Sequence, residues 1–457
     1  MSIGYPEIAA IRLGYGLSPL MPPPAGPEEV LASAARTGAG PAAITTRRAH
    51  EMRLEYQKVV RGMGPGKEKT PEFVELRNGL RELGYLQLQS RLARAAAEPV
   101  GFGERLVNFW ADHFTVRIDN PAMEAMETAF YDTAIRPKVN GRFADLLFAA
   151  ITHPAMLTYL DQVNSIGPNS RQAVAQARKG RKVGLNENLA RELLELHTVG
   201  VNSGYTQKDV RQLAELLTGL TYELKSGENF VPQRSEPGAQ SVLGVSYGGG
   251  KKASLDDIRA VLDDLAVRPD TADHLSWKLA VHFVSDNPDP DLIKAMSQAW
   301  KDTGGDLPSV YRVLVNHPAL TAQFRQKARQ PFDFIAASLR ALGMNRASVM
   351  AIESRSFRNM IFRPMTAMGQ AWGQPIGPDG WHEEAETWIT PQALAARISW
   401  AMRMPSRLRE KLPDPRLFMN TALGATVSEP LAWAVPKSES VTEGIGLVLA
   451  SADFNRR

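Results

Sequence analysis

Apolar residues recur every three to four positions along most of this chain, which is the spacing of one face of a helix. Strictly alternating segments are scarce. The best of them are residues 221–224 and 230–231, which could pair as a small hairpin. The pattern therefore predicts an all-α, multi-helical fold with a small β appendage near 220–250. The expected helices cover 27–36, 45–60, 71–97, 103–116, 122–135, 142–151, 187–199, 207–219, 255–266, 271–284, 290–302, 308–315, 330–342 and 391–403.

Two of these helices carry a histidine on the apolar side. At about 100° per residue, His197 shares one arc with Leu189 and Leu193. His113 lies among Phe109, Trp110 and other large apolar residues in the same way. An imidazole that leaves water must find new partners, so two inward histidines indicate a functional site. The structural alternative for each is a core histidine that hydrogen-bonds a buried carbonyl.

Three polar residues near these helices are further candidates for the site. Asp161 follows the apolar run 154–160 and could orient an imidazole or bind a cation. Glu192 lies at the flank of the apolar arc, and Asn186 stands at the entrance of the helix. Each has a structural alternative, namely a loop cap for Asp161, a surface ion pair for Glu192 and a helix cap for Asn186.

Lys278 and two tryptophans are the remaining candidates, as substrate contacts. Lys278 would anchor a phosphate or carboxylate; otherwise it is a surface lysine with a buried stem. Trp381 ends a Gly- and Pro-rich loop, 364–381, which would serve as a lid or a stacking platform, or else pack rigidly against the helices. Trp110 lies beside His113. The loop glycines do not match a phosphate-binding loop, which needs a preceding strand and a Lys-Ser/Thr end.

Length and composition narrow the class of protein. A chain of 457 residues exceeds what one core usually holds. We expect an N-terminal helical region at 1–100, a central core with the site at 101–345, and a C-terminal region with the Gly/Pro/Trp loop at 346–457. The absence of cysteine excludes disulfides, thiolate nucleophiles and cysteine-ligated metals, so that a metal would depend on His, Asp, Glu or Asn.

Charge and hydropathy exclude further classes. The 53 basic residues are interleaved with 49 acidic ones, which argues against nucleic acid as a partner. No run approaches the roughly 18 to 20 apolar residues that cross a bilayer, so no membrane span is expected. The first twenty residues lack a basic segment followed by an apolar core, and no signal peptide is predicted.

The order of the motifs carries a family resemblance. Arg12-Leu-Gly-Tyr-Gly16, Phe109-Trp-x-x-His113 and Pro154-Ala-Met-Leu-x-Tyr-Leu-Asp161 are followed by the block from Asn186 to His197. Then come Gly204-Tyr-Thr-x-x-Asp209, Lys278-Leu with Phe283-Val-Ser-Asp286, Gly373-Gln-Pro and Gly380-Trp381. This series resembles the bacterial family catalogued as domain of unknown function 1800, over nearly the whole chain. The resemblance implies a helical protein, often exported and often encoded beside a sulfatase-like partner.

The chain departs from that family in one loop. Where relatives commonly carry a His-Asp pair before Gly-x-Lys, residues 234–240 read Arg-Ser-Glu-Pro-Gly-Ala-Gln. Any role of that loop that depends on charge would be altered here.

Two functional hypotheses follow from these residues. The first is a hydrolase-like enzyme whose pocket gathers His113, Asp161, Glu192 and His197, with one histidine as the base and tryptophans closing over the substrate. The tryptophan content suggests a carbohydrate polymer as the substrate. A variant of this hypothesis adds a divalent metal held by His113, His197 and Asp161, although no His-Glu-x-x-His signature is present. The second hypothesis is a non-catalytic binding or scaffold protein, whose basic segment 171–182 contacts an acidic partner.

Overall fold

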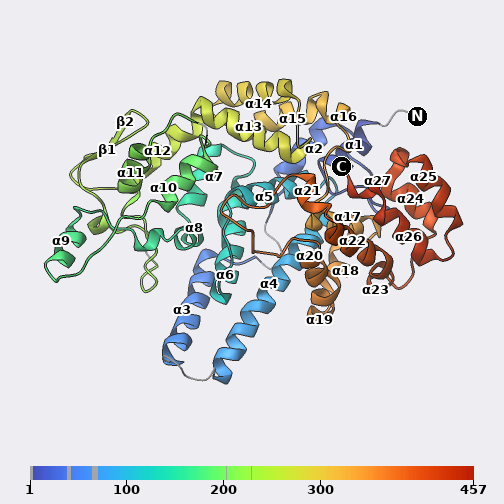
Figure 1. Cartoon of the computed structure of the whole chain (residues 1–457), viewed down its shortest axis with the longest axis horizontal. Helices are drawn as coiled ribbons and strands as arrows, with labels where there is room; N and C mark the ends of the chain where they lie inside the picture. The colour runs from blue at the N-terminus through green and yellow to red at the C-terminus, as the bar shows by residue number, and fades with distance from the viewer. Residues whose placement is uncertain (1–3, 39–42, 64–69, 202, 228) are drawn as a thin grey trace.

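The computed structural model describes residues 4–38, 43–63, 70–201, 203–227 and 229–457. Helices dominate these residues, and the only sheet among them has two strands (Figure 1). The predicted all-α class with a small β appendage is therefore confirmed. Among the described residues, none of the helices is both long and apolar enough to cross a membrane.

The first half of the chain contains the helices that build the site. Its α-helices are α1 Tyr5–Arg12, α2 Pro27–Ala34, α3 Thr46–Met63, α4 Pro71–Ala97, α5 Phe102–His113, α6 Pro121–Ala129, α7 Phe143–Ile151, α8 Pro154–Tyr159, α9 Arg171–Ala177, α10 Asn188–Glu192 and α11 Gln207–Leu217. Short π- and 3₁₀-helical segments join them: η1 Phe130–Ile135, η2 Arg136–Lys138, η3 Gln162–Asn164, η4 Leu193–His197 and η5 Pro232–Arg234.

The second half begins with the hairpin and continues in helices. It contains β1 Ala239–Val242, β2 Val245–Gly248, α12 Leu255–Val267, α13 Pro269–Phe283, α14 Pro290–Thr303, α15 Leu307–Asn316, α16 Ala319–Ala322, α17 Pro331–Ala341, α18 Arg346–Met350, α19 Ser354–Phe357, η6 Arg358–Phe362, α20 Arg363–Ala367, α21 Ala385–Trp388, α22 Pro391–Arg403, α23 Pro405–Leu408, α24 Pro415–Leu423, η7 Gly424–Thr426, α25 Glu429–Ala434, η8 Val435–Lys437, α26 Val441–Ala450 and α27 Ala452–Asn455. Proline occupies the first turn of many of these helices, where its fixed φ suits the helix and its missing N–H costs no hydrogen bond.

Buried apolar side chains form two large clusters. The first unites α1, α2 and α5 to α8 with α10 to α16. The second unites the C-terminal half of α4 with α17 to α20, α22 and α24 to α27. Helix α4 therefore contributes residues such as Leu88 and Leu92 to the C-terminal core, although it lies early in the sequence. Helices α3 and α4 also project from the body as an antiparallel pair (Figure 1).

Helix α5 runs through the first cluster and ends at the site. Gly101 precedes it with a φ of +78°, a conformation that glycine adopts without strain. Its buried acid Glu104 is joined to Arg94 at 2.7 Å and to Arg136 at 2.6 Å. Burial alone would raise the pKa of Glu104, but the two guanidinium groups lower it below its usual value. These paired charges fix α5 against α4 and η2.

The hairpin lies within 220–250 but not at the predicted strands. Residues 239–242 pair antiparallel with 245–248 around a two-residue turn. The expected strands at 221–224 and 230–231 were wrong, since Leu220 and Phe230 share only an isolated bridge. The apolar residues there, including Leu220 and Tyr222, pack into the first cluster as loop segments instead.

The predicted helix at 187–199 has two parts. It is α-helical from Asn188 to Glu192 and π-helical from Leu193 to His197. A π-turn adds a residue per turn and changes the direction of the side chains that follow. Gly200 then ends the segment with a φ of +88°, the left-handed conformation expected of a glycine after a helix.

Candidate functional site

The two histidines selected from the sequence meet in the interior. The ring centroids of His113, at the end of α5, and His197, at the end of η4, are 5.7 Å apart. His113 is 2% exposed and His197 is 1% exposed. Phe114 packs against both rings. Two segments 84 residues apart in sequence thus contribute to one buried site.

The hydrogen bonds of His113 define its tautomer. Nε2 lies 3.3 Å from the backbone carbonyl of His197, and a carbonyl oxygen only accepts, so Nε2 carries the proton. Nδ1 then has a free lone pair, and it has no protein partner among the described residues. His197 likewise has no partner for either ring nitrogen. A third ring, His274, donates from Nδ1 to the carbonyl of Thr198 at 2.7 Å.

Burial keeps these imidazoles uncharged. It lowers the pKa of His197 to about 3, and the nearby charge of Lys278 adds to the effect. It places the pKa of His113 well below its usual value, again with a contribution from Lys278. Both rings are therefore neutral at physiological pH, as a base or a hydrogen-bond acceptor must be.

A cavity of about 220 Å³ lies beside His113. Helix α5, helix α13 and the segment 379–384 form its walls. It is lined by Phe109, Asp112, His113, Trp277, Lys278, Val281, Asp286, Asp379, Trp381, His382, Glu383 and Glu384. The lining combines aromatic faces with several titratable groups, which is the composition of a ligand-binding pocket.

Asp112 and Lys278 both line this cavity, and both have shifted pKa values. Burial and the charge of Glu383 raise the pKa of Asp112 to about 8. Burial lowers the pKa of Lys278, although Asp112 and Glu383 act in the opposite direction. Burial thus favours the uncharged form of each group, and one cavity contains a carboxyl that keeps its proton at neutral pH and an amine whose pKa is lowered.

The segment 380–384 closes over Asp112. The backbone N–H of Trp381 donates to both carboxyl oxygens of Asp112, at 3.1 and 3.2 Å. Gly380 has a φ of +86°, and a Cβ there would lie 2.7 Å from the backbone oxygen of Asp112. Only glycine allows this close approach, so the loop and the end of α5 are fitted to each other.

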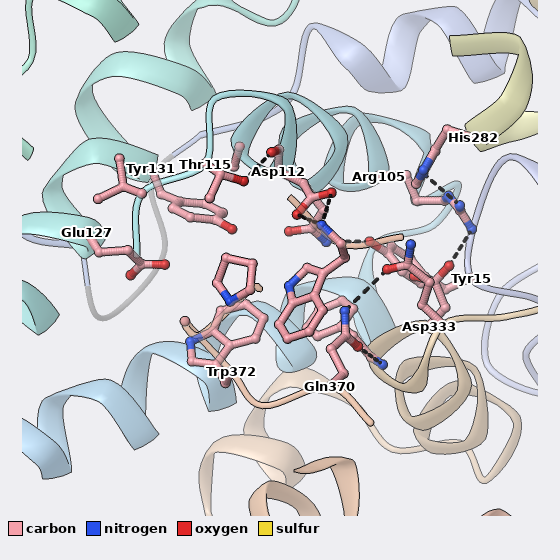
Figure 2. Close-up of a pocket in the computed structure, with 18 residues that line it drawn as sticks. Tyr15, Arg105, Asp112, Thr115, Glu127, Tyr131, His282, Asp333, Gln370 and Trp372 are labelled. Atoms are coloured by element: carbon pink, nitrogen blue, oxygen red, sulfur yellow. Dashed lines mark hydrogen bonds and ion pairs between the residues drawn. The ribbon is translucent and has the colours of Figure 1, made fainter. Parts of the chain in front are cut away.

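A smaller polar cavity of about 70 Å³ lies on the other side of Asp112 and Trp381, since both residues line each cavity. Figure 2 shows Glu127 and Tyr131 on one side of it and Tyr15 and Asp333 on the other. Its volume suits a few water molecules rather than a substrate. Burial raises the pKa of Glu127, although Arg91 lies 3.4 Å away.

A charge network connects the two cavities. His282 donates from Nδ1 to Glu383 at 2.5 Å and accepts at Nε2 from Arg105 at 3.1 Å. Lys327 lies 2.9 Å from the second Glu383 oxygen and 2.6 Å from Asp286. Burial alone would raise the pKa of Glu383, but His282 and Lys327 lower it below the usual carboxyl range. This carboxylate is therefore charged, unlike Asp112.

Four predicted residues lie outside this cavity or at its margin. Trp110 is fully buried in the first cluster and donates to the hydroxyl of Tyr311 at 2.7 Å. Asn186 accepts from the N–H of Asn188 and donates to the carbonyl of Asp161 at 3.2 Å. Asp161 itself is exposed at the start of η3, and within the described chain its hydrogen bonds are to Thr158, Asn164 and Asn186. The structure thus does not join Asp161 to either histidine.

Glu192, the fourth of these residues, is half-buried near the pocket. Burial raises its pKa, with a smaller contribution from Glu195. The charge of Asp379, which lines the cavity, also acts on it. Lys278 and Trp381, in contrast, line the cavity directly. Among the described residues no three His, Asp or Glu side chains are grouped as metal ligands, so the metal variant of the site has no support from the geometry.

Sequence reasoning missed Asp112, His282 and Glu383. Asp112 directly precedes His113 but was given no role of its own. His282 lies four residues after Lys278, so one face of α13 carries both, and that spacing was a usable signal. Glu383 comes from an irregular loop whose path no periodicity reveals.

The fold and the site define an all-α protein with a buried acid–base pocket. The chain belongs to the family described as protein of unknown function (DUF1800), whose model matches residues 9–456. The curated proteins give no match, and neither do the solved structures. Residues 235–238 and Gln240 line a separate cavity of about 410 Å³.

Proposed function

We propose that this chain is a hydrolase-like enzyme whose reaction takes place in the cavity lined by Asp112, His113, Lys278 and Trp381. The observation that carries the proposal is the pair formed by Asp112 and Lys278. Environments that move the pKa values of two groups in one cavity toward neutrality are typical of acid–base catalysis. A structural ion pair would instead lower the pKa of the acid and raise that of the base.

The two groups have complementary roles in hydrolysis. Asp112 carries a proton at neutral pH, because burial raises its pKa to about 8, and would donate that proton to a leaving group. Lys278 faces the same cavity, and burial lowers its pKa, so its amine gives up its proton more readily than a free lysine and, once neutral, would take a proton from the attacking water. Such positioned proton transfers typically accelerate a reaction by about 10² to 10⁴-fold each.

The histidines support this pair. His113 lines the cavity, and the hydrogen bond from its Nε2 to the carbonyl of His197 fixes the ring and leaves Nδ1 unprotonated. That nitrogen is sealed from solvent, so we assign the proton-accepting role to Lys278 rather than to His113. His197 lies behind His113, where a neutral ring avoids adding positive charge near Lys278.

A carbohydrate polymer fits the walls of the cavity. Trp277 is 48% exposed and lines the cavity together with Trp381. Aromatic faces of this kind pack against the apolar faces of sugar rings, while the carboxylates Asp379 and Glu384 at the rim would accept hydrogen bonds from hydroxyl groups.

Activity measurements on an isosteric variant test the proposal. The protein would be assayed with chromogenic glycosides, esters, phosphate esters and sulfate esters, followed by polysaccharides. Asp112→Asn keeps the shape of the side chain but removes its proton, and should lower kcat at least about 10²-fold. Asp302→Asn, on the exposed end of α14, is the matched control and should leave kcat unchanged. The proposal would be contradicted if the protein hydrolysed none of these substrates, or if Asp112→Asn kept full activity.

The alternative function is a non-catalytic binding protein. One observation favours it: the basic side chains of α9 and of the loop after it make no hydrogen bond or ion pair among the described residues. A sulfatase-like partner stays a prediction of the family resemblance. Co-purification of the two neighbouring gene products would test it.

A further inference from the structure

A large cavity of the described chain lies away from the acid–base pocket. It has a volume of about 410 Å³ and shares no lining residue with the two cavities around Asp112. Its walls are the start of α9, η5 with the loop that follows it to residue 238, and the glycine-rich loop 248–254 that leads from β2 into α12. These elements lie together at one end of the molecule, opposite α24–α26 (Figure 1).

Positive charge at this cavity is unpaired. Arg171, Lys251 and Lys252 line it, and within the described residues none of their side chains makes a hydrogen bond or an ion pair. All three are exposed. Cations elsewhere on this chain often have a carboxylate at close range, as Arg259 has with Asp145 at 2.7 Å.

The acids of the same cavity are already hydrogen-bonded. Both carboxylate oxygens of Glu236 accept from Asn169, at 2.8 Å from its backbone N–H and 2.6 Å from its side chain. Asp257 accepts from the N–H of Ser254 at 3.0 Å, as part of the capping box of α12. These contacts hold the walls together, and none of them pairs an acid with one of the three cations, so the lining has three basic residues against two acidic ones.

Polar donors complete the lining. The hydroxyl of Ser235 is buried and has no protein partner. Gly248 and Gly249 have φ values of +75° and +80°, so this rim exposes backbone without side chains. Phe230 is the only aromatic residue of the lining, which leaves no stacking platform for bases. The basic residues Arg178, Lys179, Arg181 and Lys182 continue the positive surface beyond α9.

We infer that this cavity binds the oxyanion of a sulfate or phosphate ester. An oxyanion has several acceptor oxygens, which three unpaired cations and a free hydroxyl donor can bind. The backbone at Gly248 and Gly249 carries no side chain that would obstruct it. The inference does not depend on the acid–base pocket, because the two sites have no residue in common.

Binding titrations with defined probes test this inference. The intact chain would be titrated calorimetrically with sodium phosphate, sodium sulfate and dextran sulfate, with uncharged dextran as the comparison. Saturable binding of at least one anionic probe is expected, and it should weaken as ionic strength rises. If the free ions compete with dextran sulfate, a single oxyanion is sufficient; if only the polymer binds, the ligand is an ester on a polymer. Either result supports the site.

Charge-matched variants distinguish binding in the cavity from non-specific attraction by the net positive charge of the protein. The triple variant Arg171→Gln, Lys251→Gln, Lys252→Gln should bind the probe at least about tenfold more weakly, since charge-assisted hydrogen bonds are lost. The control Lys294→Gln, Lys411→Gln, Arg416→Gln removes the same charge from exposed positions elsewhere and should change affinity less than about twofold. All six side chains are exposed, so both proteins should unfold at the wild-type temperature.

Three results would overturn the inference. The first is the absence of saturable binding for all three anionic probes. The second is equal binding of uncharged dextran. The third is an equal loss of affinity in the two triple variants, which would reduce the effect to net charge. None of these results concerns catalysis in the pocket of Asp112, so either proposal can fail while the other stands.

Discussion

At the scale of single residues, the protein keeps charge out of one region and concentrates it in a neighbouring one. Asp112, His113 and His197 are held uncharged by burial, whereas Glu383 is held charged by His282 and Lys327. The difference follows from partners. Glu383 has two cationic or proton-donating neighbours at short range, while Asp112 has only the N–H of Trp381. A carboxyl with one weak donor in a buried site retains its proton.

The buried histidines make stability depend on pH. Burial lowers the folded-state pKa of His197 to about 3, below the unfolded value of about 6.5. The unfolded chain therefore binds the proton first, and the stabilisation present above pH 6.5 is lost as pH falls toward the folded pKa. Between pH 6.5 and 5 the loss should be about 1.4 kcal/mol per pH unit for such a ring. Urea unfolding at several pH values would measure it.

Two histidine variants show which ring causes the pH dependence of the free energy of unfolding. His197→Asn should flatten the pH dependence, because the titrating group is gone. His382→Asn replaces an exposed ring and should leave the slope as in the wild type. Equal slopes in all three proteins would mean that His197 is not held neutral.

At the scale of elements, the site depends on how irregular segments dock on regular ones. The loop before α21 reaches Asp112 only because Gly380 allows its backbone to approach α5. Asn186 ties the entrance of α10 to the end of α8 through the carbonyls of Leu160 and Asp161. Helix periodicity predicted α5, α10 and α13, and it placed His113, His197 and Lys278 on or beside the apolar faces of these helices. It gave no information on the path of 373–384, whose conformation is set by tertiary contact.

Gly380→Ala should detach this loop from α5. The new Cβ would lie 2.7 Å from the backbone oxygen of Asp112. The φ of +86° would also hold the alanine in the left-handed conformation. Gly244→Ala is the matched control, since its φ of +84° is equivalent but nothing lies within 4 Å of the new Cβ. The control should cost about 1 to 2 kcal/mol of stability, and Gly380→Ala more than that. Thermal unfolding and tryptophan fluorescence would show the difference, and equal effects would mean that the close approach does not matter.

Asn186→Ala should destabilise the fold rather than a ligand complex. The side chain makes hydrogen bonds to Asn188, Leu160 and Asp161, and their loss should cost about 1 to 3 kcal/mol. Asn188→Ala removes an exposed side-chain amide that makes no hydrogen bond among the described residues, and it should change stability little. A variant Asn186→Ala with wild-type stability but lost ligand binding would instead support the substrate-contact hypothesis.

At the scale of the whole molecule, the second core unites distant parts of the chain. The C-terminal region predicted at 346–457 packs on Leu88 and Leu92 of α4 and on Phe334 and Leu339 of α17. The all-α class could be predicted from the sequence because helix periodicity is local. The way in which α4 completes the C-terminal core could not, because that contact joins residues more than 200 positions apart and leaves no local pattern.

A fragment of residues 346–457 should therefore not fold alone. Without α4 and α17 its apolar face would lack the partners that cover it. Circular dichroism should show reduced helicity, and urea should produce no cooperative transition. A cooperative transition in this fragment would show that the region is an independent domain.

The protonation state of Asp112 is the most direct test of the proposed chemistry. The measurement is a carboxyl-detected NMR titration of protein labelled with ¹³C in its aspartate side chains, with Asp112→Asn used to assign the signal. We expect one aspartate to remain protonated through neutral pH and to titrate near the raised pKa of about 8. Titration of every aspartate near the ordinary value of about 3.9 would contradict the acid–base pair, and with it the proposed enzymatic function.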